Sequence, residues 1–155
     1  MKARLDPYKA APATLKAVIA LEDYVQKSGL DPRLMELLKL RASQINGCAY
    51  CVDMHGRGAR AKGESDERLL QLTVWRESPL YTDAERAALA WTEALTLLPE
   101  TRAPDDVFEE LRRHFSEEDV VKLTTMIGMI NLWNRVGVGF RLLPSVGSSK
   151  AAAAE

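Results

Sequence analysis

Apolar residues recur three and four positions apart along nearly the whole chain, the spacing that places side chains on one face of a helix. Alanine, leucine, glutamate, lysine and arginine dominate, and no stretch alternates apolar and polar residues as a half-buried strand would. The pattern therefore predicts an all-α fold, a helical bundle of about seven helices. These helices are expected at residues 14–28, 32–45, 48–61, 66–74, 83–98, 107–114 and 117–136.

Several helix starts carry recognisable capping signals. Thr14 and Ser65 are suitable N-caps, because a short hydroxyl side chain can accept a hydrogen bond from a free backbone N–H of the first turn. Asp31-Pro32 combines an N-cap with proline at the first helical position. Residues 82–85 form a capping box, in which threonine and glutamate each bond to the backbone of the other.

Prolines and glycines predict where helices are interrupted. Pro7 and Pro12 indicate a non-helical arm over residues 1–11, and Pro99 is expected to end the helix that precedes it. After the long apolar helix near the C-terminus, residues 137–144 are expected to pack back onto the bundle.

Length and charge limit the possible classes of function. The chain has 155 residues, enough for one domain, which we expect at residues 1–144, with a disordered tail at 145–155. The formal net charge of −1 does not favour a general nucleic-acid or membrane-surface binder. No apolar run reaches the roughly 18 residues of a membrane span, and the start lacks the apolar core of a signal peptide, so a cytoplasmic protein is expected.

Residues 46–55 contain both cysteines of the chain and one of its two histidines. The steps from Cys48 to Cys51 and from Cys51 to His55 place two thiols and an imidazole along one edge of a helix. An imidazole beside a thiol can accept its proton and stabilise the reactive thiolate, and the second thiol can close a disulfide. Asn46-Gly47 is a break signal that places Cys48 in the first turn, where the helix dipole also favours a thiolate.

Two alternatives to redox chemistry remain open for this segment. The cysteines can be small buried residues paired by chance, or Cys48, Cys51 and His55 can be three zinc ligands with a water as the fourth. Redox use is the favoured interpretation, since a lone close cysteine pair in a reducing compartment is more often catalytic than a structural crosslink.

A carboxylate lies inside the leucine-rich helix that precedes the cysteines. Glu36 costs free energy there unless it is paired or used chemically. The alternative is a solvated Glu36 on a narrow polar strip, beside Arg41 or paired with Lys39 one turn on.

The spacing of this acid and the cysteines has a short internal echo. An acidic residue followed after twelve and fifteen positions by cysteine or asparagine occurs at 36, 48 and 51 and again at 119, 131 and 134. The echo suggests a degenerate internal repeat in which only the first copy keeps reactive groups. Asn131 and Asn134 are expected on a polar strip or in hydrogen bonds to a neighbouring helix.

The combination of Glu36, the phrase at residues 43–51 with its CxxC pair, and His55 resembles the AhpD-like alkylhydroperoxidase family within the carboxymuconolactone decarboxylase superfamily. The likeness covers about residues 5–144. It implies an all-helical fold that assembles into a homo-oligomer, a trimer or hexamer, with the site close to a subunit interface. It further implies a thiol peroxidase or disulfide reductase that needs no metal or flavin cofactor.

The resemblance also implies a role for each site residue. Cys51 would be the peroxidatic cysteine, Cys48 the resolving cysteine, His55 the proton acceptor, and Glu36 the group that orients and charge-balances His55. The partners implied are an organic hydroperoxide substrate and a dithiol, lipoyl or thioredoxin-like reductant. From the residues alone, the helix N-terminus favours Cys48 as the more acidic thiol and the neighbouring imidazole favours Cys51, so both assignments remain open at this point.

One position departs from the founding branch of the family, which carries a histidine between the two cysteines where this chain has Tyr50. The departure makes a protein disulfide reductase or slow redox sensor the main alternative to a peroxidase. Decarboxylases of the superfamily lack the CxxC pair, so ring-opening lactone chemistry is not expected.

Overall fold

The computed structural model describes residues 2–144. Within this range the chain forms nine α-helices and one 3-10 helix, and no strand. The α-helices are α1 (Pro7–Ala10), α2 (Pro12–Gln26), α3 (Pro32–Ile45), α4 (Ala49–Ala61), α5 (Asp66–Gln71), α6 (Asp83–Thr96), α7 (Leu98–Thr101), α8 (Asp105–His114) and α9 (Glu117–Phe140), with the 3-10 helix Leu72–Val74 following α5. The predicted all-α fold is confirmed, and the predicted tail at 145–155 lies outside the described residues.

The strongest capping signals mark the helices as expected. Asp31 accepts a hydrogen bond from the backbone of Arg33, and α3 runs over the predicted residues 32–45. The capping box at the start of α6 is complete, because the Thr82 and Glu85 side chains each bond to the backbone of the other.

The prediction of about seven helices was too low because prolines at two places, residues 7–12 and residue 99, were read as breaks. Pro7 and Pro12 each lie at the first position of a helix, where the missing N–H has no bonding partner to lose, so the predicted arm contains α1. Pro99 lies at the start of α7 for the same reason. At the other end, α9 continues through two glycines to Phe140 instead of stopping near residue 136.

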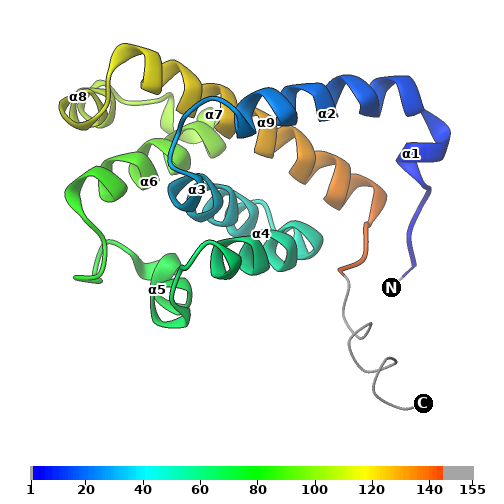
Figure 1. The fold of residues 1–155 in the computed structure, drawn as a ribbon, viewed down its shortest axis with the longest axis horizontal. Coiled ribbons are helices and arrows are strands. Elements are labelled where there is room, and N and C mark those ends of the chain that lie inside the picture. Colours follow the sequence, from blue (N-terminus) through cyan, green and yellow to red (C-terminus); the bar gives the residue numbers. More distant parts are fainter. Residues whose placement is uncertain (1, 145–155) are drawn as a thin grey trace.

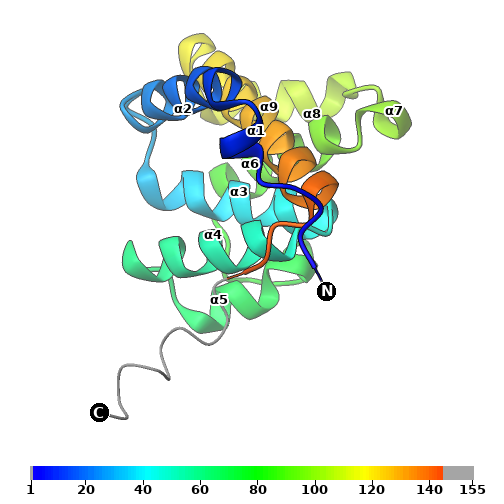
Figure 2. The ribbon, with the colours of Figure 1, turned by 90° about the vertical axis from the view of Figure 1, so that its right-hand side faces the viewer.

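Helix α3 lies at the centre of the molecule. In both views it runs between α2 on one side and α4 on the other, and the long α9 crosses beside it (Figures 1 and 2). Its contacts with α4, α6 and α9 are extensive, and Leu37, Leu38 and Ala42 are completely buried. The end of α3 and the start of α4 are thereby fixed against the final helix, and this region carries the cysteines.

The two segments of the sequence echo adopt different structures. The first runs from α3 through a turn into α4, whereas residues 119–134 all lie within the single helix α9. The matching spacing therefore does not correspond to a repeated structural unit.

Across the described range, no helix is long and apolar enough to cross a membrane.

Candidate active site

The turn between α3 and α4 positions the first cysteine. Gly47 has a φ of +67°, a left-handed conformation that glycine adopts without the strain a side chain would cause. The backbone N–H of Cys48 then bonds to the carbonyl of Ser43 at 3.0 Å, and Cys48 becomes the N-cap of α4. The prediction that Cys48 lies at the start of a helix is therefore confirmed.

Asparagines hold this turn against α9. The side-chain amide of Asn46 donates to the Oδ1 atoms of Asn131 and Asn134, both at 2.9 Å, and Asn134 donates to the hydroxyl of Ser43 at 3.0 Å. Asn131 and Asn134 are buried, so these hydrogen bonds are shielded from water. The expectation that the two asparagines bond to a neighbouring helix is confirmed.

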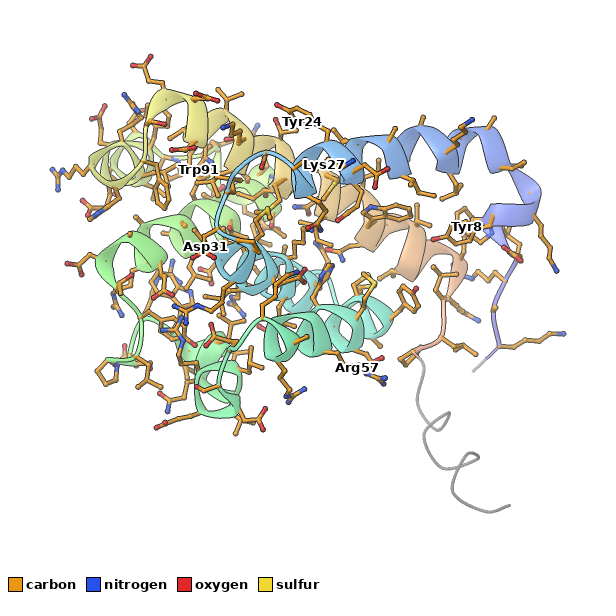
Figure 3. All side chains as sticks on the ribbon, in the orientation of Figure 1. Tyr8, Tyr24, Lys27, Asp31, Arg57 and Trp91 are labelled. Carbon is orange, nitrogen blue, oxygen red and sulfur yellow. A yellow bond between two sulfur atoms is a disulfide. The ribbon has the colours of Figure 1, made fainter. Side chains whose placement is uncertain are left out.

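Cys48 and Cys51 form a disulfide across the first turn of α4, with a Cα–Cα distance of 5.3 Å. Figure 3 shows the side chains of the described residues on the ribbon, with a disulfide as a yellow bond between two sulfur atoms. The two residues are only 1% and 2% exposed. In this oxidised form neither sulfur is a thiolate, so the zinc alternative would require a reduced state.

Gly137 of α9 provides the space for the disulfide. A Cβ atom at this position would lie 2.6 Å from Sγ of Cys48 and 3.3 Å from Sγ of Cys51. Only glycine therefore allows the helix backbone to pack this closely against the two sulfurs.

This contact predicts opposite effects for two glycine substitutions within α9. Gly137→Ala should destabilise the oxidised protein by about 1–3 kcal/mol, because the added methyl overlaps a crosslinked sulfur. Gly128→Ala is the matched control: its Cβ would meet nothing within 4 Å, so its better helix propensity should add about 1 kcal/mol. Urea unfolding of both variants measures the difference, and equal stabilisation would contradict the close contact.

His55 is buried one helical turn after Cys51 and is held from the other side by α3. Its Nδ1 lies 2.8 Å from Oε2 of Glu36, and the second oxygen of Glu36 accepts a hydrogen bond from Lys62 at 2.7 Å. The Glu36 side chain is 8% exposed. The alternative of a solvated Glu36 is thus wrong, and Lys39 is not its partner.

The pKa of Glu36 follows from these contacts. Burial alone would raise it, but the hydrogen bonds from His55 and Lys62 outweigh burial and lower the pKa from 4.5 to about 2. The carboxylate is therefore charged throughout the physiological range. It can keep a proton on Nδ1 of His55, which leaves the lone pair on Nε2.

The lowered pKa of Glu36 predicts a loss of stability in acid. A carboxyl group with a lower pKa in the folded state stabilises the fold above its unfolded pKa and loses that contribution as the pH falls. The shift from 4.5 to about 2 corresponds to about 3 kcal/mol, lost between about pH 5 and pH 2. The stability difference between the protein and Glu36→Gln should shrink by this amount in urea titrations. A difference independent of pH would contradict the pairing.

Nε2 of His55 is the one buried side-chain nitrogen or oxygen within residues 2–144 that has no hydrogen-bond partner. Buried polar atoms are rarely left unpaired, so an unpaired one at this place calls for an explanation. An imidazole with Nδ1 fixed by a carboxylate and Nε2 unpaired is arranged to accept a proton.

A second charge pair, which the sequence analysis missed, lies next to this site. Lys39 is completely buried and donates to Glu22 of α2 at 2.8 Å, and the indole of Trp133 donates to the same carboxylate at 3.1 Å. Burial raises the pKa of Glu22, but the hydrogen bond from Lys39 and its charge lower it overall. The signal for this pair was weak, since a lysine within a leucine run shows only that some partner is needed.

The chain matches a known family over the segment that carries these residues. The model of the Carboxymuconolactone decarboxylase family covers residues 12–94. YdfG, an uncharacterised protein of Bacillus subtilis, is 40% identical over 138 residues, which are 89% of this chain and 94% of YdfG. AhpD of Solibacter usitatus, an alkyl hydroperoxide reductase, is 41% identical over 63 residues, which are 41% of this chain and 33% of AhpD.

A solved structure extends the likeness to almost the whole chain. It is the crystal structure of an Agrobacterium tumefaciens protein of unknown function, for which a role in antioxidant defence of the AhpD type has been suggested. It superposes with a TM-score of 0.92 at 56% sequence identity, covering 94% of this chain and 99% of the other. The last helix, which the family model does not reach, is thus included in this comparison.

Proposed function

The chain belongs to the carboxymuconolactone decarboxylase family and to its AhpD-like branch, and from this premise we propose that it is a thiol peroxidase that reduces organic hydroperoxides. The observation that carries the proposal is the Cys48–Cys51 disulfide followed, one helical turn later, by a buried His55 whose Nδ1 is held by Glu36. This arrangement supplies a nucleophile, a base and a resolving group without a metal or an organic cofactor.

In the first step of the proposed reaction, Nε2 of His55 accepts the proton of the Cys51 thiol, directly or through a water molecule. The thiolate attacks the terminal oxygen of the hydroperoxide, forming an S–O bond as the O–O bond breaks. The departing alkoxide takes the proton from His55 and leaves as an alcohol. Cys51 is then a sulfenic acid, and Glu36 has balanced the charge of the transient imidazolium throughout.

In the second step, the Cys48 sulfur attacks the sulfenic acid of Cys51. The disulfide forms, the hydroxyl group departs with the Cys48 proton as water, and two electrons have passed from the two thiols to the peroxide. A dithiol reductant restores both thiols by disulfide exchange and is itself oxidised to a disulfide.

The surroundings of Cys51 favour an organic substrate. Cys51 borders a cavity of about 160 Å³, whose other walls are mostly apolar or aromatic. The cavity is lined by Tyr8, Glu22, Tyr50, Cys51, Met54, Trp133 and Leu142. Apolar walls stabilise an alkyl or aryl group more than they stabilise hydrogen peroxide, whose polar groups would be left without partners.

The test is to expose the fully reduced protein to one equivalent of cumene hydroperoxide and to alkylate the remaining thiols. Mass spectrometry should show one intramolecular disulfide between Cys48 and Cys51 for each alcohol released. Hydrogen peroxide at the same concentration is the comparison and should react more slowly. Free thiols after exposure to cumene hydroperoxide would rule the proposal out.

A protein disulfide reductase or redox sensor is the second candidate. Two observations favour it: both cysteines are almost completely buried, and Tyr50 stands where the founding branch has a histidine. A sensor of this kind would form the disulfide once and be reduced slowly. Many turnovers with hydroperoxide and a small dithiol would exclude it.

Self-association into a trimer or hexamer, in a reducing cytoplasm, is also part of the proposal. The apolar excess of α3 is satisfied inside the chain, whereas α9 leaves Val121, Leu132 and Val138 exposed. An oligomer would therefore use α9 rather than α3. Light scattering at micromolar concentration measures the mass of the particle.

A further inference from the structure

The two sulfurs of the disulfide border different cavities. Cys51 borders the apolar cavity of about 160 Å³, and Cys48 borders a second cavity of about 340 Å³. Tyr50 and Leu142 line both cavities and stand between them. The disulfide can therefore be approached from two sides that differ in chemistry.

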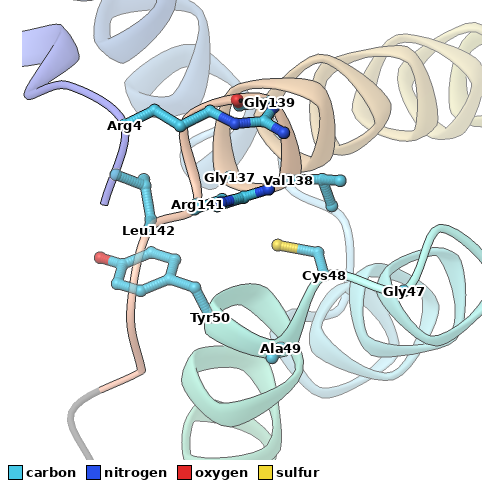
Figure 4. A pocket seen from close by; sticks show the side chains of 10 residues that line it. All are labelled: Arg4, Gly47, Cys48, Ala49, Tyr50, Gly137, Val138, Gly139, Arg141 and Leu142. Carbon is cyan, nitrogen blue, oxygen red and sulfur yellow. Dashed lines mark hydrogen bonds between the residues drawn. The ribbon is translucent and has the colours of Figure 1, made fainter. Parts of the chain in front are cut away.

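The cavity beside Cys48 is cationic. Its lining includes the side chains of Arg4 and Arg141 and no carboxylate. Figure 4 shows both guanidinium groups on the side of the cavity that the sulfur of Cys48 faces. Neither arginine forms an ion pair with any carboxylate of residues 2–144. Two unpaired cations beside a reactive sulfur indicate an anionic ligand.

The backbone fixes both arginines at the end of α9. The N–H of Arg4 bonds to the carbonyl of Phe140 at 3.0 Å, and one guanidinium nitrogen of Arg4 bonds to the carbonyl of Gly139 at 2.8 Å. Arg141 caps the helix with a φ of +55°. A guanidinium carries five N–H donors, so Arg4 retains most of its donors for a ligand.

We propose that the cavity beside Cys48 binds the carboxylate of an anionic dithiol, the reductant that regenerates the enzyme, through Arg4 and Arg141. This inference rests on the proposed function and names the class of reductant for the same site. Each cavity would then serve one reactant. The hydroperoxide reaches Cys51 from the apolar cavity, and the reductant reaches Cys48 from the cationic cavity.

The exchange reaction balances with this geometry. A thiolate of the dithiol attacks Sγ of Cys48, a new S–S bond forms, and the Cys48–Cys51 bond breaks. The electron pair leaves on Cys51. The proton that the attacking thiol released passes to the Cys51 thiolate by way of His55, one helical turn further along α4. The second thiol of the reductant then attacks the reductant sulfur that is bonded to Cys48. Cys48 is released as a thiol, taking up the proton of the second thiol, and the reductant leaves as a cyclic disulfide.

The test compares two reductants that share their thiols and carbon skeleton, dihydrolipoate with its carboxylate and dihydrolipoamide with a neutral amide. Reduction of the oxidised protein is stopped by alkylation and followed by mass spectrometry. Dihydrolipoate should react about five- to tenfold faster at low ionic strength. The preference should decline in about 0.5 M salt, which screens exposed charges.

Substitutions at the cavity separate charge recognition from reactivity. Arg141→Gln should reduce the ratio of the two rates several-fold, Arg141→Glu should reverse the preference, and Arg4→Gln gives a second variant from another segment. Arg33→Gln removes an exposed arginine at the start of α3 and should keep the wild-type ratio.

The outcomes distinguish this inference from the proposed function. Equal rates for the two dithiols in the wild type would overturn anion recognition while dithiol-dependent turnover remained. A rate ratio that no substitution of Arg4 or Arg141 changes would overturn it as well. If hydroperoxide oxidised the thiols but neither dithiol reduced the disulfide, both the inference and the dithiol half of the catalytic cycle would be wrong.

Discussion

Cys51→Ser is expected to abolish hydroperoxide reduction, lowering the rate by about 10³-fold or more, the scale seen when an enzyme loses its nucleophile. A serine hydroxyl at this position, one helical turn before His55, stays protonated, and its oxygen cannot be oxidised to a sulfenic acid. The measurement is consumption of cumene hydroperoxide under excess dithiol. The residual rate should equal that of the double variant lacking both thiols.

Cys48→Ser is the matched comparison and should fail at a later step. The first equivalent of peroxide should still react, and Cys51 should remain a sulfenic acid that dimedone can trap. Turnover should cease because no second thiol can resolve it. The opposite result, trapping at Cys48 in Cys51→Ser, would assign the peroxidatic role to Cys48, whose place at the N-terminus of α4 also favours a thiolate.

Glu36→Gln is expected to slow oxidation of Cys51 about 10²-fold, within the range contributed by general base catalysis. The charged carboxylate 2.8 Å from Nδ1 keeps the proton on that nitrogen and stabilises the imidazolium. A neutral amide can accept the same hydrogen bond but does not balance the charge, and its NH₂ end would favour the wrong tautomer. Single-turnover oxidation followed against pH measures the effect.

Glu93→Gln provides the control for a merely structural role. Glu93 is half-buried, with a side chain 12% exposed. Burial raises its pKa, but hydrogen bonds from Trp75, Arg76 and Arg41 lower the pKa overall, so the carboxylate is charged. It lies in α6, and its hydrogen bonds go to Arg41, Trp75 and Arg76 rather than to His55. Glu93→Gln should therefore destabilise the fold while the oxidation rate stays unchanged. If both variants lost the same fraction of the Cys51 oxidation rate, the role of Glu36 would be limited to stabilising the fold.

Capping residues and apolar spacing predicted those helix bounds that depend only on residues close in the sequence. Helix α3 was predicted over its observed residues because Asp31-Pro32 and the apolar pattern act within a few turns. The predicted end of α9 was wrong because the low helix propensity of glycine was taken as a stop signal. Gly137 instead packs against the sulfurs of Cys48 and Cys51, a contact between distant segments that the local sequence does not show.

The same distinction holds within the site. Helical spacing placed Cys48, Cys51 and His55 on one edge of α4, but the pairing of Glu36 with His55 joins two helices and came from the family resemblance. Lys62 lies one residue beyond the helix predicted at 48–61, and no partner was predicted for it. It follows His55 by seven residues, two helical turns, so its place on the same face was the signal that could have identified it as a partner of Glu36.

The asparagine contacts between the cysteine turn and α9 affect how the protein folds during synthesis. Asn46 bonds to partners 85 and 88 positions later in the chain. Contacts between such distant segments form late, because closing a long loop costs chain entropy before any contact is gained. On the ribosome, the turn with both thiols emerges well before the helix that anchors it. Burial of the cysteines is thus among the last events of folding, and the thiols of a nascent chain are more exposed to unwanted oxidation than those of the folded protein.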